Sequence, residues 1–173
     1  LPVPVVWNSG GYDRVETLAA LEGKIQIYLP DYKYTDPDTA RRYAGAADYP
    51  ETARTAIREM VRQTGPYQLD ENGILTRGVI LRHLLLPGGL NQAKEVMDWV
   101  AETFPPHTIL FSLMSQYTPW GKAADSPPLD RRLRKSEIRA AEAYFTNLGL
   151  DGFTQGVEAA QADYIPTFDL TGV

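Results

Sequence analysis

The sequence of 173 residues contains no cysteine. A disulfide framework is therefore excluded, and so is any metal or iron–sulfur site that thiolates of this chain would hold. Histidine is scarce too, because His83 and His107 are the 2 histidines present, too few for a histidine-rich metal site. No nucleophile elbow, Walker A loop or dinucleotide-binding glycine pattern occurs. We therefore expect no metal ligands within this chain.

Excess positive charge and long apolar runs are also lacking. The net charge is −5 and the pI is near 5.0, a balance that argues against a nucleic-acid partner. A basic cluster of Arg131, Arg132, Arg134 and Lys135 is followed at once by Glu137, a pattern typical of a solvated helix start. No apolar run reaches membrane-spanning length and no signal-peptide pattern opens the chain, so we expect no membrane partner and a cytoplasmic location.

Apolar runs alternate with helical patterns along the chain. Strands are predicted over residues 3–7, 24–29, 79–86 and 108–114, the first of them as a buried strand. Helices are predicted over residues 13–21, 37–43, 50–64, 91–104 and 135–148. Asp36 and Asn91 are the expected N-caps of two helices, and Ser136 is an alternative cap of the last. Between these elements we expect a polar stretch over residues 67–78 with a turn at Asn72-Gly73, and a long loop over residues 115–133.

Nearly continuous apolar strands, rather than strictly alternating ones, indicate parallel strands that are buried on both faces. The four strand–helix units predict an α/β fold, either an open sheet or half of a βα barrel. Residues 1–150 are expected to form one domain, and residues 151–173 a less regular tail that packs on it or extends it. Because a strand is predicted directly after Leu1, we also expect that upstream sequence is missing through natural processing or laboratory truncation.

Ligands of parallel α/β sheets bind beyond the carboxyl ends of the strands. This rule selects polar residues at four strand ends: Asn8 and Ser9, then Asp31 and Lys33, then Arg82, and finally Thr118 within a polar and aromatic loop. The loop at Thr118 either lines a pocket or packs on the last helix. The segment Asn8-Ser9-Gly10-Gly11 either approaches a ligand closely or forms a simple tight turn.

Asp31 and Lys33 are two residues apart, so on an extended segment their side chains point to one side. Together they would grip a zwitterion, or they form a mutual surface salt bridge. Arg82 either faces an anionic ligand or forms a buried pair with a carboxylate such as Asp31. Its neighbour His83 points the opposite way and is expected to be a core histidine. His107 is assigned no role.

Four strand-end segments carry a family resemblance: Asn8-Ser9-Gly10-Gly11-Tyr12, residues 27–34, residues 82–88 and Met114-Ser115-Gln116-Tyr117. Over residues 1–150 the chain resembles pyruvate formate-lyase-activating enzymes and their relatives in the radical S-adenosylmethionine (SAM) superfamily. The resemblance implies a partial TIM-like barrel that binds SAM over a 4Fe–4S cluster. In such enzymes, an electron from the cluster cleaves SAM to a 5′-deoxyadenosyl radical, which abstracts a hydrogen atom from a glycine of a partner enzyme.

The resemblance also implies which residues of this chain contact SAM. Asp31 and Lys33 match an Asp-x-Lys pattern near the cofactor, and Asn8 and Ser9 begin a SAM-contacting loop in which activating enzymes have an acid at the first position. Arg82 lies in the third matching segment. Thr118 stands where the family has a SAM-contacting histidine, judged from the Gly121-Lys122 that follows.

The sequence departs from the family by what is missing. The Cys-x-x-x-Cys-x-x-Cys loop and the Gly-Gly-Glu segment, which follow the first two barrel strands, are both absent. We therefore expect the C-terminal half of a radical SAM barrel, inactive alone and without tightly bound SAM or cluster. Its expected partners are the missing N-terminal half of its own barrel and a protein substrate such as a glycyl-radical enzyme, or a second copy joined through the open sheet edge. The alternative is a cluster-free α/β domain that binds a small metabolite or docks on a partner.

Overall fold

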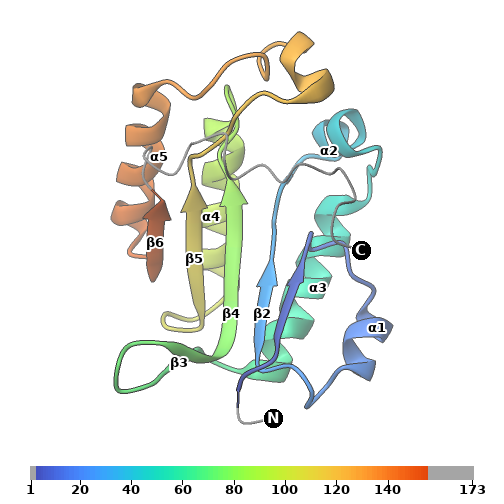
Figure 1. Cartoon of the computed structure of the whole chain (residues 1–173), viewed down its shortest axis with the longest axis vertical. Coiled ribbons are helices and arrows are strands. Elements are labelled where there is room, and N and C mark those ends of the chain that lie inside the picture. The colour runs from blue at the N-terminus through green and yellow to red at the C-terminus, as the bar shows by residue number, and fades with distance from the viewer. Residues whose placement is uncertain (1–2, 156–173) are drawn as a thin grey trace, which may run out of the picture.

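A computed structural model describes residues 3–155 of the chain (Figure 1). Five strands form a parallel sheet in the order β1 (Val6–Ser9), β2 (Ile27–Pro30), β4 (Leu75–Leu84), β5 (Ile109–Met114) and β6 (Gly152–Gln155). A sixth short strand, β3 (Gln68–Leu69), pairs antiparallel with the start of β4. The α/β fold predicted from the sequence is therefore confirmed, and the sheet with its helices forms part of a TIM-like barrel.

The helices of the chain follow the strands in sequence. They are α1 (Val15–Ala20), α2 (Pro37–Ala44), α3 (Tyr49–Thr64), α4 (Leu90–Thr103) and α5 (Lys135–Leu148), with a 3-10 helix, η1 (Gly121–Asp125), in the long loop after β5. In Figure 1, α3 and α4 lie behind the sheet, whereas α2 and η1 lie beyond its upper edge, where the parallel strands end. Among residues 3–155, no helix is both long and apolar enough to cross a membrane.

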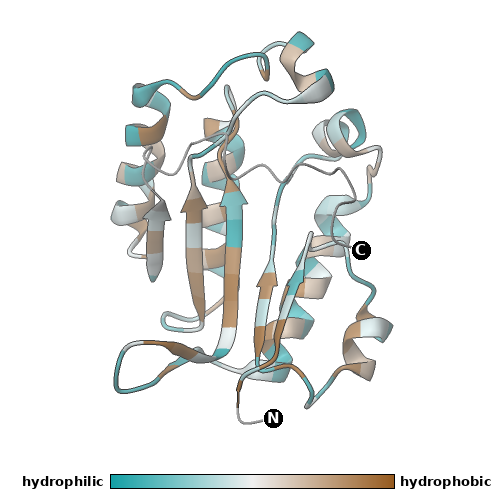
Figure 2. Ribbon diagram, in the orientation of Figure 1, coloured by the Kyte–Doolittle hydropathy of each residue, from teal (hydrophilic) through white to brown (hydrophobic). Residues whose placement is uncertain are grey.

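One face of the sheet carries the hydrophobic core. Val79 and Leu81 of β4 are fully buried, and the register places them beside Tyr28 of β2 and Phe111 of β5. Side chains from α3, α4 and α5 pack on this face, because each of these helices presents a stripe of apolar residues at helical spacing. Figure 2 shows β4 and β5 largely hydrophobic, with one hydrophilic segment near the carboxyl end of β4.

The opposite face of the sheet is only partly covered within the described residues. The strand residues next to those of the core point to this face, because successive side chains of a strand alternate. Ile80, Leu84 and Leu110 are half-buried here, and Val6 is 50% exposed. In a closed βα barrel this face lines the interior. The described part of the chain thus forms a curved segment of a barrel wall with its helices outside.

Several predicted elements differ from those observed. The first strand begins at Val6 rather than Val3 and is not buried, because β1 lies at the edge of the sheet and pairs with β2 alone among the described strands. The polar stretch before residue 79 forms β3 and the first residues of β4, around the predicted turn at Asn72-Gly73. Helix α4 starts at Leu90, so Asn91 lies inside its first turn and Gly89 is the N-cap. Ser136 likewise lies inside α5, which Arg134 precedes as N-cap.

Other local predictions are confirmed. The Asp36 side chain accepts a hydrogen bond from the Thr39 N–H at 2.7 Å and so caps α2. The predicted range of α5 matches the observed one, with Gly149 following in a left-handed conformation. The long loop after β5 contains η1. Strand β6, which extends the sheet beside β5, was not predicted from the sequence, and the rest of the predicted tail lies outside the described residues.

Gly152 permits β6 to approach β5 closely. Its φ is 144°, and a Cβ added there would lie 1.9 Å from the carbonyl oxygen of Phe111. We predict that Gly152→Ala lowers the free energy of unfolding by roughly 1–3 kcal/mol, because the strands must separate or the backbone must move. Urea denaturation followed by circular dichroism measures the loss.

Gly23→Ala is the matched control for this substitution. Gly23 also has a positive φ, 77°, but nothing lies within 4 Å of an added Cβ. Backbone strain alone then costs about 1 kcal/mol. Equal losses in the two variants would show that the close contact between β5 and β6 does not limit stability.

Candidate functional site

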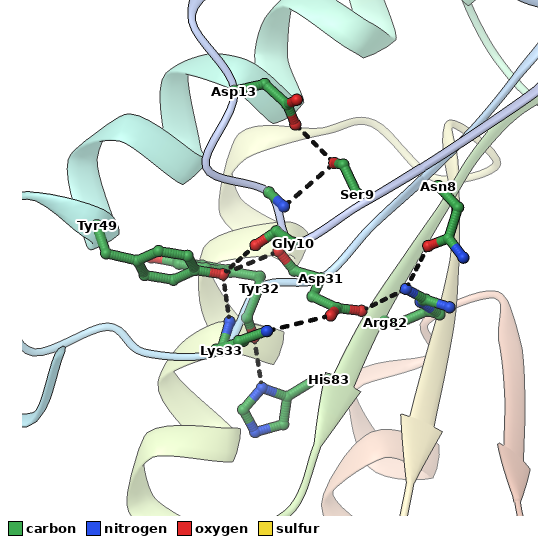
Figure 3. A network of polar contacts seen from close by, with 11 residues as sticks. Asn8, Ser9, Gly10, Asp13, Asp31, Tyr32, Lys33, Tyr49, Arg82 and His83 are labelled. Atoms are coloured by element: carbon green, nitrogen blue, oxygen red, sulfur yellow. Dashed lines mark hydrogen bonds and ion pairs between the residues drawn. The ribbon is translucent and has the colours of Figure 1, made fainter. Parts of the chain in front are cut away.

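Residues from three strands meet at the carboxyl edge of the sheet (Figure 3). Nη2 of Arg82, on β4, lies 2.7 Å from Oδ1 of Asp31, which follows β2. The same nitrogen donates a hydrogen bond of 2.7 Å to Oδ1 of Asn8, on β1. Three of the residues selected from the sequence are thus brought together by the parallel order of β1, β2 and β4. The sequence alternative of an Arg82–Asp31 pair is the arrangement observed.

Asp31 lies between two cationic side chains. Its second carboxylate oxygen, Oδ2, is 3.6 Å from Nζ of Lys33. The Lys33 side chain keeps 47% of its surface exposed, against 21% for Asp31. The Lys33 ammonium therefore shares the carboxylate with Arg82 and still faces solvent. A contact of this length near the surface contributes little to stability, so it leaves Lys33 available to a ligand.

The loop after β1 forms a tight turn that packs against Asp31. The hydroxyl of Ser9 donates to Oδ2 of Asp13 at 2.6 Å and accepts the N–H of Gly11 at 3.2 Å. Gly11 has a φ of 76°, and a Cβ there would lie 2.1 Å from the carbonyl oxygen of Asp31. Glycine is required at this position because only a residue without a side chain lets the two loops touch.

Tyr49, the first residue of α3, ties these loops together (Figure 3). Its hydroxyl accepts the backbone N–H of Lys33 at 2.9 Å and shares its single proton between the carbonyl oxygens of Gly10 and Asp31, at 2.9 Å and 3.0 Å. The ring is only 4% exposed, and burial raises the pKa of the phenol well above its ordinary value. The hydroxyl therefore stays protonated and can serve as both donor and acceptor.

His83 is a core residue, as predicted. Its side chain is 1% exposed on the helix-covered face of β4, opposite to Arg82. Nδ1 lies 2.7 Å from the carbonyl oxygen of Tyr32, and burial lowers the pKa of the imidazole, so the neutral ring donates this hydrogen bond. His107 is exposed and pairs with Asp151 at 2.8 Å, away from the site.

A cavity of about 730 Å³ opens beside Asp31 and Lys33. Its floor includes residues at the carboxyl ends of β4 and β5, and its walls come from α2 and the η1 loop. The lining comprises Asp31, Lys33, Tyr34, Arg42, Tyr43, Leu84, Leu86, Met114, Tyr117, Lys122, Ala123, Ser126 and Leu129. Asn8, Ser9, Arg82 and Thr118 are not part of this lining, although Tyr117, the neighbour of Thr118, is.

Glu137 holds together three segments that lie next to the lining of the cavity. Its carboxylate receives two hydrogen bonds from Arg131, at 2.8 and 2.9 Å, and one each from the backbone N–H groups of Arg134 and Gly88, both at 2.8 Å. This one side chain joins the turn after β4, the end of the η1 loop and the start of α5. The Arg131 guanidinium, with the two N–H donors, lowers the pKa of the Glu137 carboxyl to about 2.

The sequence analysis missed Tyr49, Arg42, Tyr43 and Glu137 as residues of this region. The periodic pattern places a helix over residues 50–64 and another over 37–43, but it carries no signal for which helical side chain reaches a loop. Glu137 was noted in the sequence only as a neighbour of the basic cluster. Within residues 3–155, no group of three or more His, Asp or Glu side chains is placed to hold a metal ion.

We predict that Tyr49→Phe lowers the free energy of unfolding by roughly 1–3 kcal/mol, because the Lys33 N–H and two carbonyl groups lose a buried partner. The measurement is the urea concentration at the midpoint of unfolding, with the dependence of the unfolding free energy on urea unchanged. Tyr43→Phe serves as control, since the Tyr43 hydroxyl has no hydrogen bond to another residue of the described range and its loss should cost less than about 0.5 kcal/mol. Equal midpoints for the two variants would contradict a structural role of the Tyr49 hydroxyl.

A second prediction concerns the pH dependence of stability. The pKa of Glu137 is lowered from 4.5 to about 2 on folding, so its contribution is complete above pH 4.5 and is lost as the pH falls toward 2. Glu137→Gln should therefore destabilise the chain by roughly 1–3 kcal/mol at pH 7, and the difference should shrink below pH 4.5. Urea midpoints at several pH values test this. A difference for Glu137→Gln that stays constant down to pH 3 would refute the prediction.

Comparisons with known proteins find similarity both in sequence and in fold. No protein-family model matches the sequence. An uncharacterised protein of Methanocaldococcus jannaschii is 29% identical over 150 residues, which are 86% of this chain and 40% of that protein. The chain therefore spans less than half the length of this relative.

A solved structure with the same fold is a domain of pyruvate-formate lyase-activating enzyme from Bacteroides vulgatus. It superposes with a TM-score of 0.57 over 83% of this chain and 75% of that domain, at 16% sequence identity. The chain thus has the α/β architecture found in a domain of an activating enzyme, which is the fold that the sequence resemblance implies.

Proposed function

We propose that this chain is the C-terminal half of a radical SAM barrel, and that the intact protein is an activating-enzyme-like radical SAM enzyme. The observation that carries this proposal is the group formed by Asp31, Lys33 and Arg82. It lies at the carboxyl edge of a parallel sheet, beside a cavity of about 730 Å³. The fold shared with a domain of an activating enzyme supports the same assignment. The short span relative to the M. jannaschii protein agrees with a chain that is part of a larger unit.

The residues present fit one end of SAM. The methionine moiety of SAM is a zwitterion, and Asp31 and Lys33 offer a carboxylate and an ammonium group on one side of the chain. Nε of Arg82 is buried and has no hydrogen-bond partner among the described residues, so one donor remains next to Asp31. In our proposal Asp31 and Lys33 hold the amino-acid moiety, and Arg82 and Asn8 keep Asp31 in place. We include Ser9 and Thr118 among the proposed SAM-binding residues because of the family resemblance.

The residues present do not fit the iron–sulfur cluster. The chain has no cysteine, so the cluster ligands must come from elsewhere, and no step through the cluster can be assigned to residues of this chain. Bound SAM supplies a carbon-centred radical when it is cleaved reductively. The role that we propose for this half of the barrel is to bind and orient the methionine end of SAM.

We propose that strand β1 is the place where the rest of the barrel joins. Within the described residues it pairs on one side only, with β2, and its other edge offers unpaired backbone groups. The missing N-terminal half of the barrel would pair there. A second copy of the chain is the alternative occupant of this edge, and a glycyl-radical enzyme is the proposed protein substrate of the intact enzyme.

The alternative function is a cluster-free domain that binds a small metabolite. The complete lack of cysteine favours it, together with a cavity that this chain forms without help from another. The two functions differ in whether the intact protein cleaves SAM.

The test is the formation of 5′-deoxyadenosine by the intact protein after anaerobic cluster reconstitution and reduction with dithionite. We predict that Asp31→Asn and Lys33→Met each lower the rate of 5′-deoxyadenosine formation at limiting SAM at least tenfold. Each substitution removes one charged contact to the zwitterion. Asp38→Asn, which removes a carboxylate on the exposed side of α2, should leave the rate unchanged. An intact protein that cleaves no SAM would overturn the proposal, and unchanged rates in the two site variants would remove Asp31 and Lys33 from the SAM site.

A further inference from the structure

The cavity at the carboxyl edge is rich in positive charge. Three cationic side chains line it, and they come from three separate elements: Lys33 after β2, Arg42 on α2 and Lys122 on η1. Asp31 is the acidic residue of the lining, and Arg82 and Lys33 both lie close to its carboxylate. The chain as a whole has a net charge of −5, so this concentration of cations is opposite in sign to the rest of the molecule.

The remaining lining is aromatic and apolar. Tyr34 and Tyr43 lie with ring centroids 6.1 Å apart, and the guanidinium of Arg42 lies 5.3 Å from the centroid of the Tyr43 ring. The hydroxyl of Tyr117 donates to the carbonyl oxygen of Leu129 at 2.7 Å, so its ring is held in the wall. Leu84, Leu86 and Met114 add apolar surface. Flat rings beside cations are suited to a ligand that has a planar body and an anionic group.

The positive charge of the cavity does not extend into the depression beside it. A neighbouring depression of about 260 Å³ shares Tyr43, Leu86 and Leu129 with it but carries Asp36 and Glu95 in place of the cations. The shared wall thus separates a cationic cavity from an acidic one. An anionic group is attracted to the first and repelled by the second, which gives a ligand a defined orientation.

We propose that the cavity binds an organic anion with an aromatic body, its phosphate or carboxylate group facing Arg42 and Lys122. This inference rests on the proposed function in that it names a class of ligand for the cavity that Asp31 and Lys33 border. A volume of about 730 Å³ lies within the range of small-molecule sites. Arg42 and Lys122 supply the charge, and Tyr34, Tyr43 and Tyr117 supply the flat surfaces.

The test is a titration of the ¹⁵N-labelled chain with phenyl phosphate, and with phenol as the uncharged probe that has the same aromatic ring. We expect phenyl phosphate to bind at least tenfold more tightly than phenol, with the largest amide shifts at Tyr34, Tyr43 and residues 117–126. Arg42→Met and Lys122→Met should each weaken phenyl phosphate at least fivefold and leave phenol unchanged. Lys94→Met is the matched control, because Lys94 of α4 lies over the ring of Tyr144 of α5, outside the lining. Its loss should change neither affinity.

Two outcomes would overturn the inference: equal affinities for the two probes, or amide shifts centred on the basic cluster Arg131–Lys135 instead of the cavity. The ¹⁵N spectra of the variants show directly whether each one is folded, and both substituted side chains are exposed. The result is independent of SAM cleavage. A chain that binds phenyl phosphate in the cavity while the intact protein cleaves no SAM would refute only the proposed function, and the reverse result would refute only this inference.

Discussion

The arrangement of the site depends on one ion pair, between Arg82 and Asp31. Arg82 lies on the open face of the central strand β4, where a charge needs a partner. The parallel pairing of β2 with β4 continues one step past the strand end, as the Tyr32 N–H donates to the Arg82 carbonyl oxygen at 2.9 Å, and this brings Asp31 beside Arg82. Once Asp31 is fixed there, Lys33 follows on the same side of an extended segment. The loop after β1 then closes against Asp31 through Gly11.

The sequence predicts those features that depend on local pattern. Helical spacing places α3 and α5 within one residue of their observed bounds, and the rule for parallel sheets selects Asp31, Lys33 and Arg82 before any coordinates are known. The same patterns fail where tertiary context decides. Residues 3–7 are apolar like a buried strand, but β1 is an edge strand and Val6 is half exposed. The four residues of β6 are too few, and too polar at Thr154 and Gln155, to stand out as a strand.

The partners of Tyr49 and Glu137, which are distant in sequence, could not be predicted. Tyr49 binds carbonyl groups 39 and 18 residues away, and Glu137 reaches the Gly88 N–H across 49 residues. Neither contact can be recognised from residue spacing or composition, since a tyrosine at a helix start and a glutamate in a first helical turn are both common. Arg42 and Lys122 are exposed residues of an amphipathic helix and a loop. They line the same cavity only because the fold brings α2 and η1 together.

The same contacts determine which charges act in the cavity. Asp31 is paired with Arg82 and Lys33, and Glu137 is paired with Arg131 and two backbone donors, so neither carboxylate is paired with Arg42 or Lys122. At physiological ionic strength, charges more than about 8 Å apart are largely screened when they face solvent. Solvent-facing acidic residues that lie farther than this from the pocket therefore have little influence inside it. A protein of net charge −5 can thus attract an anion here, because local geometry rather than total charge determines the potential that the ligand meets.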